Sequence, residues 1–530
     1  MAVAAEASAQ LEPELARARE LAREANVIPI AHRFVDDVET PVSAFLKLRS
    51  AFGGSSFLLE SAEQGARLGR YSFLGFRPRI ELRWSEGTLT ELGDRGPADS
   101  EVDDPYAAVA ARLGEYRVAE AERLPPFAGG AVGYFGYDLV RTVERLGPPN
   151  PDPLGIPDLA LMVCELMVAF DHLKHEVTML AYARVDGPDE VEPAYERSTR
   201  LIEEARAALR APTPHSPRPA TEPAGGDARA DEEGPSRRRG QFVRAGAEQP
   251  AGFVPNMSRE EFEANVARII EYIRAGDAYQ VVPSQRFTGR APVEAFSIYR
   301  GLRTVNPSPY MYFLEFGDFQ IAGASPEPLV KVSGRRVEAR PIAGTYPRGG
   351  SEEEDRRRAE ELLADPKERA EHVMLVDLAR NDLGRVSEYG SVAVDELMVV
   401  ETYSHVLHIV SQVSGTLREG LNAMDVLRAS LPAGTLSGAP KVRAMEIIDE
   451  LEPHKRCSYG GAIGYLSFTG DLDTAIHIRT AVIKDGQVHI QAGGGTVADA
   501  QPAREYEESL SKAEAMFQAI ETAVAQPDWG

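Results

Sequence analysis

Cysteine is scarce in this sequence of 530 residues, which contains only Cys164 and Cys457. The two lie nearly 300 positions apart, and neither belongs to a closely spaced group of the kind that ligates zinc or marks a disulfide framework. A small disulfide-stapled fold and a thiolate metal site are therefore excluded as the basis of this protein.

Long apolar runs and a surplus of basic residues are also missing. No stretch approaches the roughly 18 apolar residues of a membrane-spanning helix, and residues 1–26 lack the basic start and apolar run of a secretory signal. Acidic residues outnumber basic ones by 82 to 58, which gives a formal charge of −24 and excludes the basic footprint of a nucleic-acid-binding protein. We expect a soluble, cytoplasmic, globular protein.

The chain has enough apolar residues, 43%, for a large core, and its length favours two domains. Residues 211–250 are rich in proline, glycine, serine and charge and show almost no apolar periodicity. Such a segment cannot bury enough surface to offset the entropy lost on ordering. We interpret it as a mobile linker between an N-terminal domain, residues 1–210, and a C-terminal domain, residues 251–530.

Helices and strands alternate irregularly in the C-terminal region. Ser258 and Glu261 have the spacing of a capping box, and Gly276 can end the helix that they begin. Other patterns predict helices over 368–383 and 505–524 and strands over 279–287, 474–483 and 487–492. Without a regular βαβ alternation, we predict an α+β fold built on a large, mainly antiparallel sheet.

Several polar residues could carry chemistry, but each has an ordinary structural explanation. The glycine run 493–495 separates a strand from a helix and could approach an anion or simply form a turn. Glu371 and Glu508, on separate helices, would suit a hard cation such as Mg²⁺. Glu508 and Lys512 also have the i, i+4 spacing of a surface ion pair, which spacing alone favours.

Two further residues are equally open. Arg479, inside the predicted strand and on one face with His477, requires a carboxylate of the protein, a ligand or solvent. His408 lies in an apolar run, where a histidine is more often a core residue than a catalyst.

Nine segments, taken together and in order, closely resemble the chorismate-utilising enzymes, and among them the large subunits of anthranilate synthases. They are distributed along essentially all of residues 251–530. They are 278–284 (AYQVVPS), 306–311 (NPSPYM), 323–327 (GASPE), 340–345 (RPIAGT), 371–385 (EHVMLVDLARNDLGR), 432–441 (PAGTLSGAPK), 459–465 (YGGAIGY), 478–480 (IRT) and 505–508 (EYEE). The resemblance is looser in the N-terminal region, where 58–61 (LLES) and 130–137 match.

The resemblance implies a two-domain α+β fold of packed sheets with surrounding helices and an active site in the C-terminal domain. By similarity, Glu371 and Glu508 hold Mg²⁺, which binds one carboxylate of chorismate and offsets the negative charge that an anionic substrate would meet. Glu327 resembles the general acid that protonates the leaving hydroxyl, and His408 and Thr435 are family positions near the loss of pyruvate. The positions implied to bind substrate are Gly344, Thr345, Tyr459, Arg479, Gly493, Gly494, Gly495 and Lys512.

Two positions bear on the branch of the family. Relatives that add water resemble one another in carrying a lysine where this chain has Gln280, and aminodeoxychorismate synthases often carry a lysine where it has Ala343. Both absences favour ammonia as the nucleophile and attack at C2, which implies anthranilate synthase. The alternatives are a 2-amino-2-deoxyisochorismate synthase, an aminodeoxychorismate synthase component and, from another class, a non-catalytic tryptophan-sensing subunit.

The resemblance also implies regulation and a partner. Ser61, with Pro309, Tyr310 and Met311, matches the tryptophan-binding segments of feedback-inhibited members. Neither cysteine lies in the glycine-rich turn of an amidotransferase nucleophile, so ammonia from glutamine would require a separate glutamine amidotransferase subunit. The chain departs from the family at Tyr346, Cys457 and His477.

Overall fold

A computed structural model describes residues 11–62, 69–93, 96–121, 123–214, 252–402, 406–526 and 529. Most of the predicted linker, from residue 215 onward, lies outside the described residues. The described helices are α1 (Leu15–Leu21), α2 (Pro41–Phe52), α3 (Pro105–Gly114), α4 (Val191–Leu209), α5 (Arg259–Ala275), α6 (Ala295–Val305), α7 (Glu352–Ala364), α8 (Pro366–Gly384), α9 (Ala423–Ser430), α10 (Gly434–Ser437), α11 (Lys441–Leu451) and α12 (Pro502–Ala525).

One long antiparallel sheet runs through both halves of the chain. Its strands follow the order β1 (Val27–Val35), β8 (Glu176–Arg184), β7 (Leu159–Asp171), β3 (Tyr71–Ser85), β2 (Ser56–Glu60), β12 (Tyr310–Glu315), β13 (Phe319–Ser325), β22 (Thr480–Lys484), β23 (Gln487–Gly493), β11 (Ser284–Arg290) and β9 (Phe253–Pro255).

A second antiparallel run shares the long strands β3 and β7 with the first. From β5 (Gly96–Glu101) it passes through β4 (Thr88–Gly93), β3, β7, β6 (Gly130–Phe135), β20 (Ala462–Ser467), β21 (Leu472–Ile476), β14 (Pro328–Ser333), β15 (Arg336–Ala339) and β18 (Val406–Thr416), which also pairs with β16 (Ile342–Pro347) and β17 (Ala393–Thr402). A short pair, β10 (Gln280–Val281) with β19 (Gly438–Ala439), stands apart.

The two runs separate where β3 is irregular. Its register against β7 shifts between Pro78 and Ile80, because proline cannot donate to the ladder. Before the shift β3 lies between β2 and β7, and after it β3 lies between β4 and β7. The bulge therefore lets two long strands take part in both sheets.

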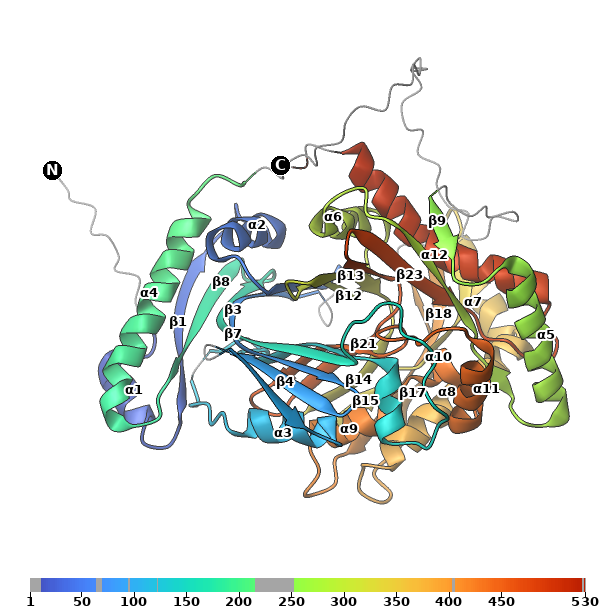
Figure 1. Ribbon diagram of the computed structural model, residues 1–530, viewed down its shortest axis with the longest axis horizontal. Helices are drawn as coiled ribbons and strands as arrows, with labels where there is room; N and C mark the ends of the chain where they lie inside the picture. Colours follow the sequence, from blue (N-terminus) through green and yellow to red (C-terminus); the bar gives the residue numbers. More distant parts are fainter. Residues whose placement is uncertain are drawn as a thin grey trace, which may run out of the picture.

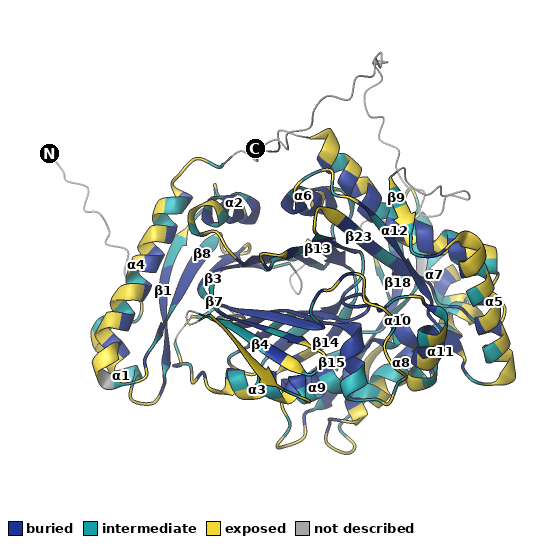
Figure 2. Cartoon of the chain, viewed as in Figure 1, coloured by how far each residue is buried: buried dark blue, intermediate teal, exposed yellow. Residues whose placement is uncertain are grey.

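Helices cover the outer faces of the two runs. Figure 1 shows α2, α6 and α12 along one side of the molecule and α3, α9 and α8 along the other. Figure 2 shows that these helices are buried on the side facing the strands and exposed on the other, as expected for amphipathic helices packed on sheets. The predicted α+β fold of packed, mainly antiparallel sheets with surrounding helices is confirmed.

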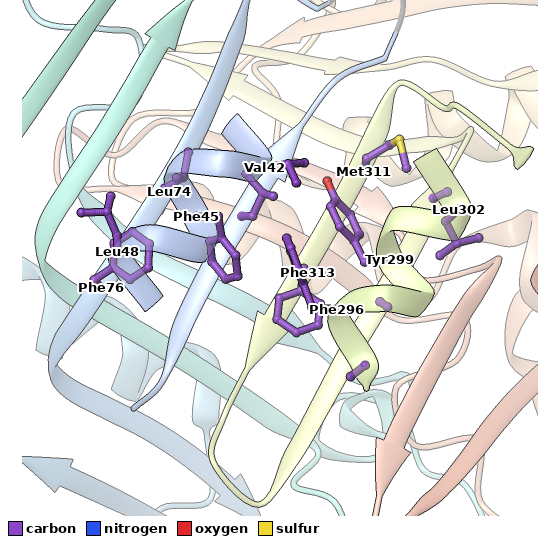
Figure 3. Packing of buried hydrophobic residues seen from close by; sticks show 14 of the residues in the cluster. Val42, Phe45, Leu48, Leu74, Phe76, Phe296, Tyr299, Leu302, Met311 and Phe313 are labelled. Carbon is purple, nitrogen blue, oxygen red and sulfur yellow. The ribbon is translucent and has the colours of Figure 1, made fainter. Parts of the chain in front are cut away.

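Strands from the two halves of the chain share one core. Phe45 of α2 packs against Phe296 of α6, with ring centroids 4.8 Å apart, and against Phe313 of β12 at 5.7 Å (Figure 3). Each of these rings is at most 1% exposed, and burying one contributes about 2–3 kcal/mol. Because β2 pairs with β12 and β6 pairs with β20, the predicted domains share both sheets. Their boundaries stay a prediction.

Local sequence signals placed the helices well. Helix α5 begins with the predicted capping box of Ser258 and Glu261 and ends at Gly276, whose φ is 92°. Helices α8 and α12 extend the predicted helices at 368–383 and 505–524 by a few residues. The hairpin of β22 and β23 turns at Asp485 and Gly486, between the predicted strands over 474–483 and 487–492. No described helix is long and apolar enough to cross a membrane.

Two predicted strands were wrong in detail. The strand over 279–287 is broken into β10 and β11 at Pro283, which lacks the N–H that a continuous ladder needs. The strand over 474–483 is broken into β21 and β22. The break falls at Arg479, whose φ of 50° lies in the left-handed region and is incompatible with a strand.

Candidate active site

Four carboxylates from two helices gather near one point. Helix α8 contributes Glu368 and Glu371, and α12 contributes Glu505 and Glu508. Burial and the neighbouring charge of Glu371 raise the pKa of Glu368, and Glu508 adds to this rise. The mutual influence of the four groups shows that the two helices present them to a common space.

Backbone and amide groups connect Glu371 to Glu508. The side-chain amide of Gln280 donates to Oε1 of Glu371 over 3.3 Å and lies against Gly495, where a Cβ atom would collide with it. At Gly494 an added Cβ would lie 3.0 Å from Oε1 of Glu508. The glycine run therefore approaches the acidic groups more closely than a side chain would allow. Gly493 is similarly confined by the carbonyl of Pro283.

The cluster has the chemistry of a site for a hard divalent cation. Burial first, and then the charge of Glu508, raises the pKa of Glu505 to about 7, and the buried Oε2 of Glu505 has no hydrogen-bond partner. Oxygen ligands of this kind are those that Mg²⁺ prefers. As they stand, no three described His, Cys, Asp or Glu side chains converge enough to coordinate an ion. The donor set fits Mg²⁺, and coordination would draw the carboxylates together.

Lys512 pairs with one of these carboxylates. Its ammonium lies 2.8 Å from Oε1 of Glu508, and both side chains are nearly half exposed. The ion pair expected from the i, i+4 spacing is therefore present. The charge of Lys512 also acts on Glu327, where it lowers the pKa, so Lys512 lies between the acidic cluster and the predicted general acid.

Glu327 is placed by the tight connection between β13 and β14. Its backbone carbonyl accepts from the amide of Ile476 over 2.9 Å, and Oγ1 of Thr435 donates to its Oε2 over 3.4 Å. Burial raises the pKa of Glu327, although the positive charge of Arg479 opposes the rise. A carboxyl group whose pKa is raised holds its proton more readily, which suits general acid catalysis.

Arg479 projects from the bend between β21 and β22, not from within a strand as predicted. Burial lowers the pKa of its guanidinium, and Glu327 provides the opposing charge. Within the described part of the chain, Arg479 forms no ion pair or side-chain hydrogen bond. A desolvated guanidinium without a partner is a strong receptor for a carboxylate from outside the protein.

His408 is oriented by the backbone of β16. Its Nδ1 donates to the carbonyl oxygen of Gly344 over 2.9 Å, and burial lowers the pKa of the ring. Since a carbonyl can only accept, the neutral ring carries its proton on Nδ1 and the lone pair on Nε2. Gly344 has a φ of 65° and a Cβ there would lie 3.0 Å from Oε2 of Glu368. In the strand register, Thr345 is paired with His408.

Tyr459 is held by a buried ion pair. The guanidinium of Arg456 lies 5.7 Å from the centre of the Tyr459 ring and pairs with Glu452, and both charged side chains are at most 6% exposed. Burial raises the pKa of Tyr459, while Arg456 opposes this rise. Arg456 also donates to the carbonyls of Leu436 and Val282, so one buried cation ties the Tyr459 turn to α10 and to the segment after β10.

The segments predicted to bind tryptophan meet in the first sheet. Strand β2 pairs with β12, which places Glu60 opposite Met311, and the amide of Ala62 donates to the carbonyl of Ser308 over 3.1 Å. Ser61, which directly follows β2, has a buried Oγ without a hydrogen-bond partner among the described residues. Sequence positions about 250 residues apart therefore lie side by side.

Aromatic and acidic side chains surround this junction. Tyr310 donates to Oδ1 of Asp473 over 3.0 Å, and burial raises the pKa of both groups. The neighbouring Tyr465, whose charge acts on Tyr310, stacks on Phe127 with ring centroids 4.2 Å apart. Pro309 is buried at the start of β12. Aromatic walls with an acidic group and an unsatisfied hydroxyl suit an amino acid with an aromatic side chain.

The three family departures have different surroundings. The prediction that His477 shares a strand face with Arg479 was wrong, because the strand is broken there. His477 is enclosed between the rings of Tyr134 and Tyr312, 6.2 and 6.0 Å away. Cys457 is buried with its Sγ 3.3 Å from Oδ1 of Asp152. Tyr346 donates to Asp365 over 3.3 Å, beside the start of α8.

Sequence reasoning missed Glu368 and Glu505. Each lies three residues before a predicted metal ligand, Glu371 or Glu508, and so on the same helical face. That repeated Glu-x-x-Glu spacing on two helices was the available signal. It was ambiguous because the same spacing occurs on any solvated acidic helix.

Comparisons with known proteins identify the family. A family model described as chorismate binding enzyme matches residues 55–518. The chain is 50% identical to anthranilate synthase component 1 of Pseudomonas putida over 498 residues, covering 93% of this chain and 95% of that protein. It is 47% identical to the component 1 of Thermus thermophilus, with 94% and 98% covered.

Solved structures are similar as well. The crystal structure of anthranilate synthase component I from Streptococcus pneumoniae superimposes with a TM-score of 0.70 at 38% identity, covering 86% of this chain and 93% of that one. MenF, the menaquinone-specific isochorismate synthase of Escherichia coli, superimposes with a TM-score of 0.65 at 17% identity, which supports the fold alone.

Proposed function

This chain belongs to the chorismate binding enzymes, and from that premise we propose that it is the chorismate-converting component of an anthranilate synthase, producing anthranilate and pyruvate from chorismate and ammonia. The observation that carries the proposal is the partly buried guanidinium of Arg479, which has no partner among the described side chains and lies close enough to Glu327 for the two charges to interact. Chorismate carries two carboxylates and needs two positive counterparts.

Arg479 supplies one of these counterparts. The acidic cluster supplies the other once it holds Mg²⁺, with Glu371 and Glu508 as the residues that would bind the ion and Glu368 and Glu505 beside them. When bound, the ion would offset the charges of Glu371 and Glu508 and could receive one substrate carboxylate. Gly494 and Gly495 keep the chain close to these groups, and their amides can donate to the same anion.

The chemistry requires a proton for the departing C4 hydroxyl. Glu327 is the group for this step, because burial raises its pKa and Thr435 holds its Oε2. Ammonia then attacks C2. Gln280 is hydrogen-bonded to Glu371 and cannot act as a base toward water, so a nucleophile that is already neutral and basic is favoured.

Loss of pyruvate requires removal of the C2 proton. The proton on Nδ1 of His408 is held by the Gly344 carbonyl, which leaves the lone pair of Nε2 as the basic site of the neutral ring. We assign His408 to this step or to positioning next to it. Aromatisation supplies the driving force, so the site mainly orients the ring and neutralises charge.

The choice of product rests on two side chains that are absent. Position 343 is alanine, which cannot form a covalent bond to C2 and move the amine to C4. Position 280 is glutamine, which cannot activate water. An enzyme that stops at 2-amino-2-deoxyisochorismate would use the same residues, so the product itself must be identified.

One assay separates these functions. The purified chain is incubated with chorismate, Mg²⁺ and ammonium at alkaline pH, and the products are identified by mass and fluorescence. Fluorescent anthranilate with an equal amount of pyruvate is expected. A non-aromatic amino product without pyruvate would replace the proposal by the deoxyisochorismate synthase, and no turnover would replace it by a non-catalytic tryptophan-sensing role.

We also propose that tryptophan inhibits this enzyme at the junction of β2 and β12. The unsatisfied Oγ of Ser61 and the carboxyl group of Asp473 offer polar contacts to an amino acid, and Tyr310 and Tyr465 offer aromatic walls. The junction joins β2 to β12, so a ligand there can alter how the N-terminal strands sit against the catalytic half.

Glutamine-dependent activity requires a second protein. The described cysteines Cys164 and Cys457 are both buried and burial raises the pKa of both thiols, which is the opposite of an activated nucleophile. The relatives are named as component 1, and we propose a glutamine amidotransferase subunit as the partner. Adding such a subunit should allow glutamine to replace ammonium in the assay.

A further inference from the structure

A second concentration of charge lies far along the sequence from the catalytic residues, between α4 and the strands β3, β7 and β8. It is a cavity of about 290 Å³ whose lining includes five arginines and two glutamates. We name this cavity the arginine pocket after its five arginines, which are Arg77, Arg79, Arg184, Arg197 and Arg200. In a chain of net charge −24, this excess of three positive charges in one cavity requires an explanation.

The two glutamates do not satisfy these arginines. Glu165 lies 4.0 Å from Arg77 and 3.7 Å from Arg79, and Glu204 lies 4.0 Å from Arg77. These separations exceed hydrogen-bonding distance, so the guanidinium donors of the two arginines on β3 remain available. The carboxylates lower the local potential without occupying the donors.

Two arginines on α4 have no acidic partner at all. Within the described part of the chain, neither Arg197 nor Arg200 forms an ion pair within 4.0 Å or a side-chain hydrogen bond. The two are three positions apart, on one face of the helix, and both line the cavity. Like charges at this spacing destabilise a helix unless an anion lies between them.

The backbone of Arg77 supports a specialised site. Its φ of 52° places a non-glycine residue in the left-handed region, directly before the bulge at Pro78. This conformation is strained and persists where the surrounding structure requires it. Both Arg77 and Arg79, on either side of Pro78, line the cavity.

Three other lining residues are held by contacts within the protein. Tyr182 donates to the carbonyl of Ala128 over 2.8 Å, and Ser198 is buried on α4. Arg184 stacks over the ring of Tyr116 at 5.0 Å, and its Nε lies 3.4 Å from Oδ1 of Asp186. A cavity with guanidinium groups on the strands and on the helix matches an anion that offers many acceptor oxygens.

We propose that the arginine pocket binds a compact multivalent phosphate anion, such as a diphosphate or a small bisphosphorylated metabolite. Guanidinium groups bind phosphate oxygens through paired, charge-assisted hydrogen bonds. The arginines come from β3, β8 and α4, so two linked phosphate groups offer acceptor oxygens to the strand wall and the helix wall together. None of these residues belongs to the proposed chorismate or tryptophan site.

Inorganic pyrophosphate is the probe for this site. Isothermal titration of the full chain, in phosphate-free buffer with EDTA to keep metal ions from the acidic cluster, should give one binding site. Its affinity should fall as salt is added, and inorganic phosphate should bind at least ten times more weakly. Absence of binding by the wild-type chain, or equal affinity for the two anions, overturns the proposal.

The matched variants are Arg197→Gln with Arg200→Gln in the pocket and Arg268→Gln with Arg274→Gln on α5. Both pairs remove two positive charges from an exposed helix face. The first should weaken pyrophosphate binding at least tenfold and the second should not change it. Equal losses would show a general charge effect and overturn the site.

Arg77→Gly provides a second test. Glycine adopts the positive φ without strain, so this variant should keep or raise the melting temperature while binding pyrophosphate at least fivefold more weakly. Unchanged binding of pyrophosphate by Arg77→Gly would contradict the proposal that β3 contributes to the binding site.

Discussion

The ammonium of Lys512 lies 2.8 Å from Oε1 of Glu508. One residue proposed to bind substrate is thus paired with one proposed to bind the metal ion. The ion pair of Lys512 and Glu508 cannot persist when a metal ion binds Glu508, because the ion would repel the neighbouring ammonium. Lys512 must then move away from Glu508, and the charge it exerts on Glu327 shows that the substrate space lies within its reach.

Replacement of Lys512 should therefore have opposite effects on the two ligands. In Lys512→Met, Mg²⁺ should bind two- to fivefold more tightly without substrate, since an exposed ion pair of this kind is worth about 0.3–1 kcal/mol. The KM for chorismate should rise at least tenfold because a substrate contact is lost. Calorimetric titration with Mg²⁺ and steady-state kinetics measure the two effects.

A lysine remote from the site controls for charge alone. Lys174→Met, in the exposed turn between β7 and β8, should change neither the Mg²⁺ affinity nor the KM. If Lys512→Met weakens both ligands together, the competition described above does not exist.

Glu327 should matter for turnover more than for binding. Glu327→Gln keeps the shape and the hydrogen bond from Thr435 but removes the acidic proton, so kcat should fall by about 10²–10⁴-fold, the range of general acid catalysis. The KM for chorismate should change by less than about threefold. Rapid quench and steady-state assays at several pH values provide the measurement.

The pH profile distinguishes this role from simple positioning. Burial raises the pKa of Glu327, so wild-type activity should fall at high pH as the acid ionises, and Glu327→Gln should lose that limb of the profile. A variant with low activity but the wild-type profile would assign the acid to another residue.

Features that depend on neighbouring residues could be predicted from the sequence, whereas features that depend on tertiary contacts could not. Helix α5 could be predicted to within a residue because its capping box and terminal glycine act within one turn. The breaks at Pro283 and Arg479 were missed, since apolar alternation continued across both. Proline removes a donor that only a neighbouring strand would require, and the bend at Arg479 depends on tertiary contacts rather than on neighbouring residues.

The same contrast between local signals and tertiary contacts applies to the residues of the candidate site. Glu371 and Glu508 came from resemblance, and their proximity depends on Gln280 and Gly494, which no helical or strand periodicity connects. The arginine pocket was not predicted, because its members are spread over β3, β8 and α4 and each is an ordinary surface arginine when considered alone. Only the tertiary arrangement shows that they share one cavity.

Ser61 provides the test of regulation. Ser61→Phe fills the space next to its unsatisfied Oγ with a ring, so tryptophan at concentrations that inhibit the wild type should no longer inhibit, and the inhibitory constant should rise at least tenfold. The kcat without tryptophan should remain within about twofold of wild type, because Ser61 lies outside the catalytic residues. Inhibition curves in the ammonia-dependent assay measure both.

Ser72→Ala is the matched control, since Ser72 is also a buried serine of the same sheet but is bonded to His172 at 2.7 Å. It should retain inhibition by tryptophan. Undiminished inhibition of Ser61→Phe would place the regulatory site elsewhere.

His477 makes the stability of the protein depend on pH. Burial between Tyr134 and Tyr312 lowers the pKa of His477 to about 3, from an ordinary value of 6.5, and neither ring nitrogen has a hydrogen-bond partner. Between these values the unfolded chain binds a proton that the folded chain does not. The free energy of unfolding is therefore unaffected by this titration above about pH 6.5 and decreases as the pH falls, by about 2 kcal/mol at pH 5.

His477→Leu, which titrates in neither state and leaves no unsatisfied nitrogen, should be more stable than the wild type, and the gain should be larger at pH 5 than at pH 8. Thermal melts at the two values measure it against His175→Asn, an exposed histidine in a turn. A gain that is equal at both values would attribute the effect to packing alone.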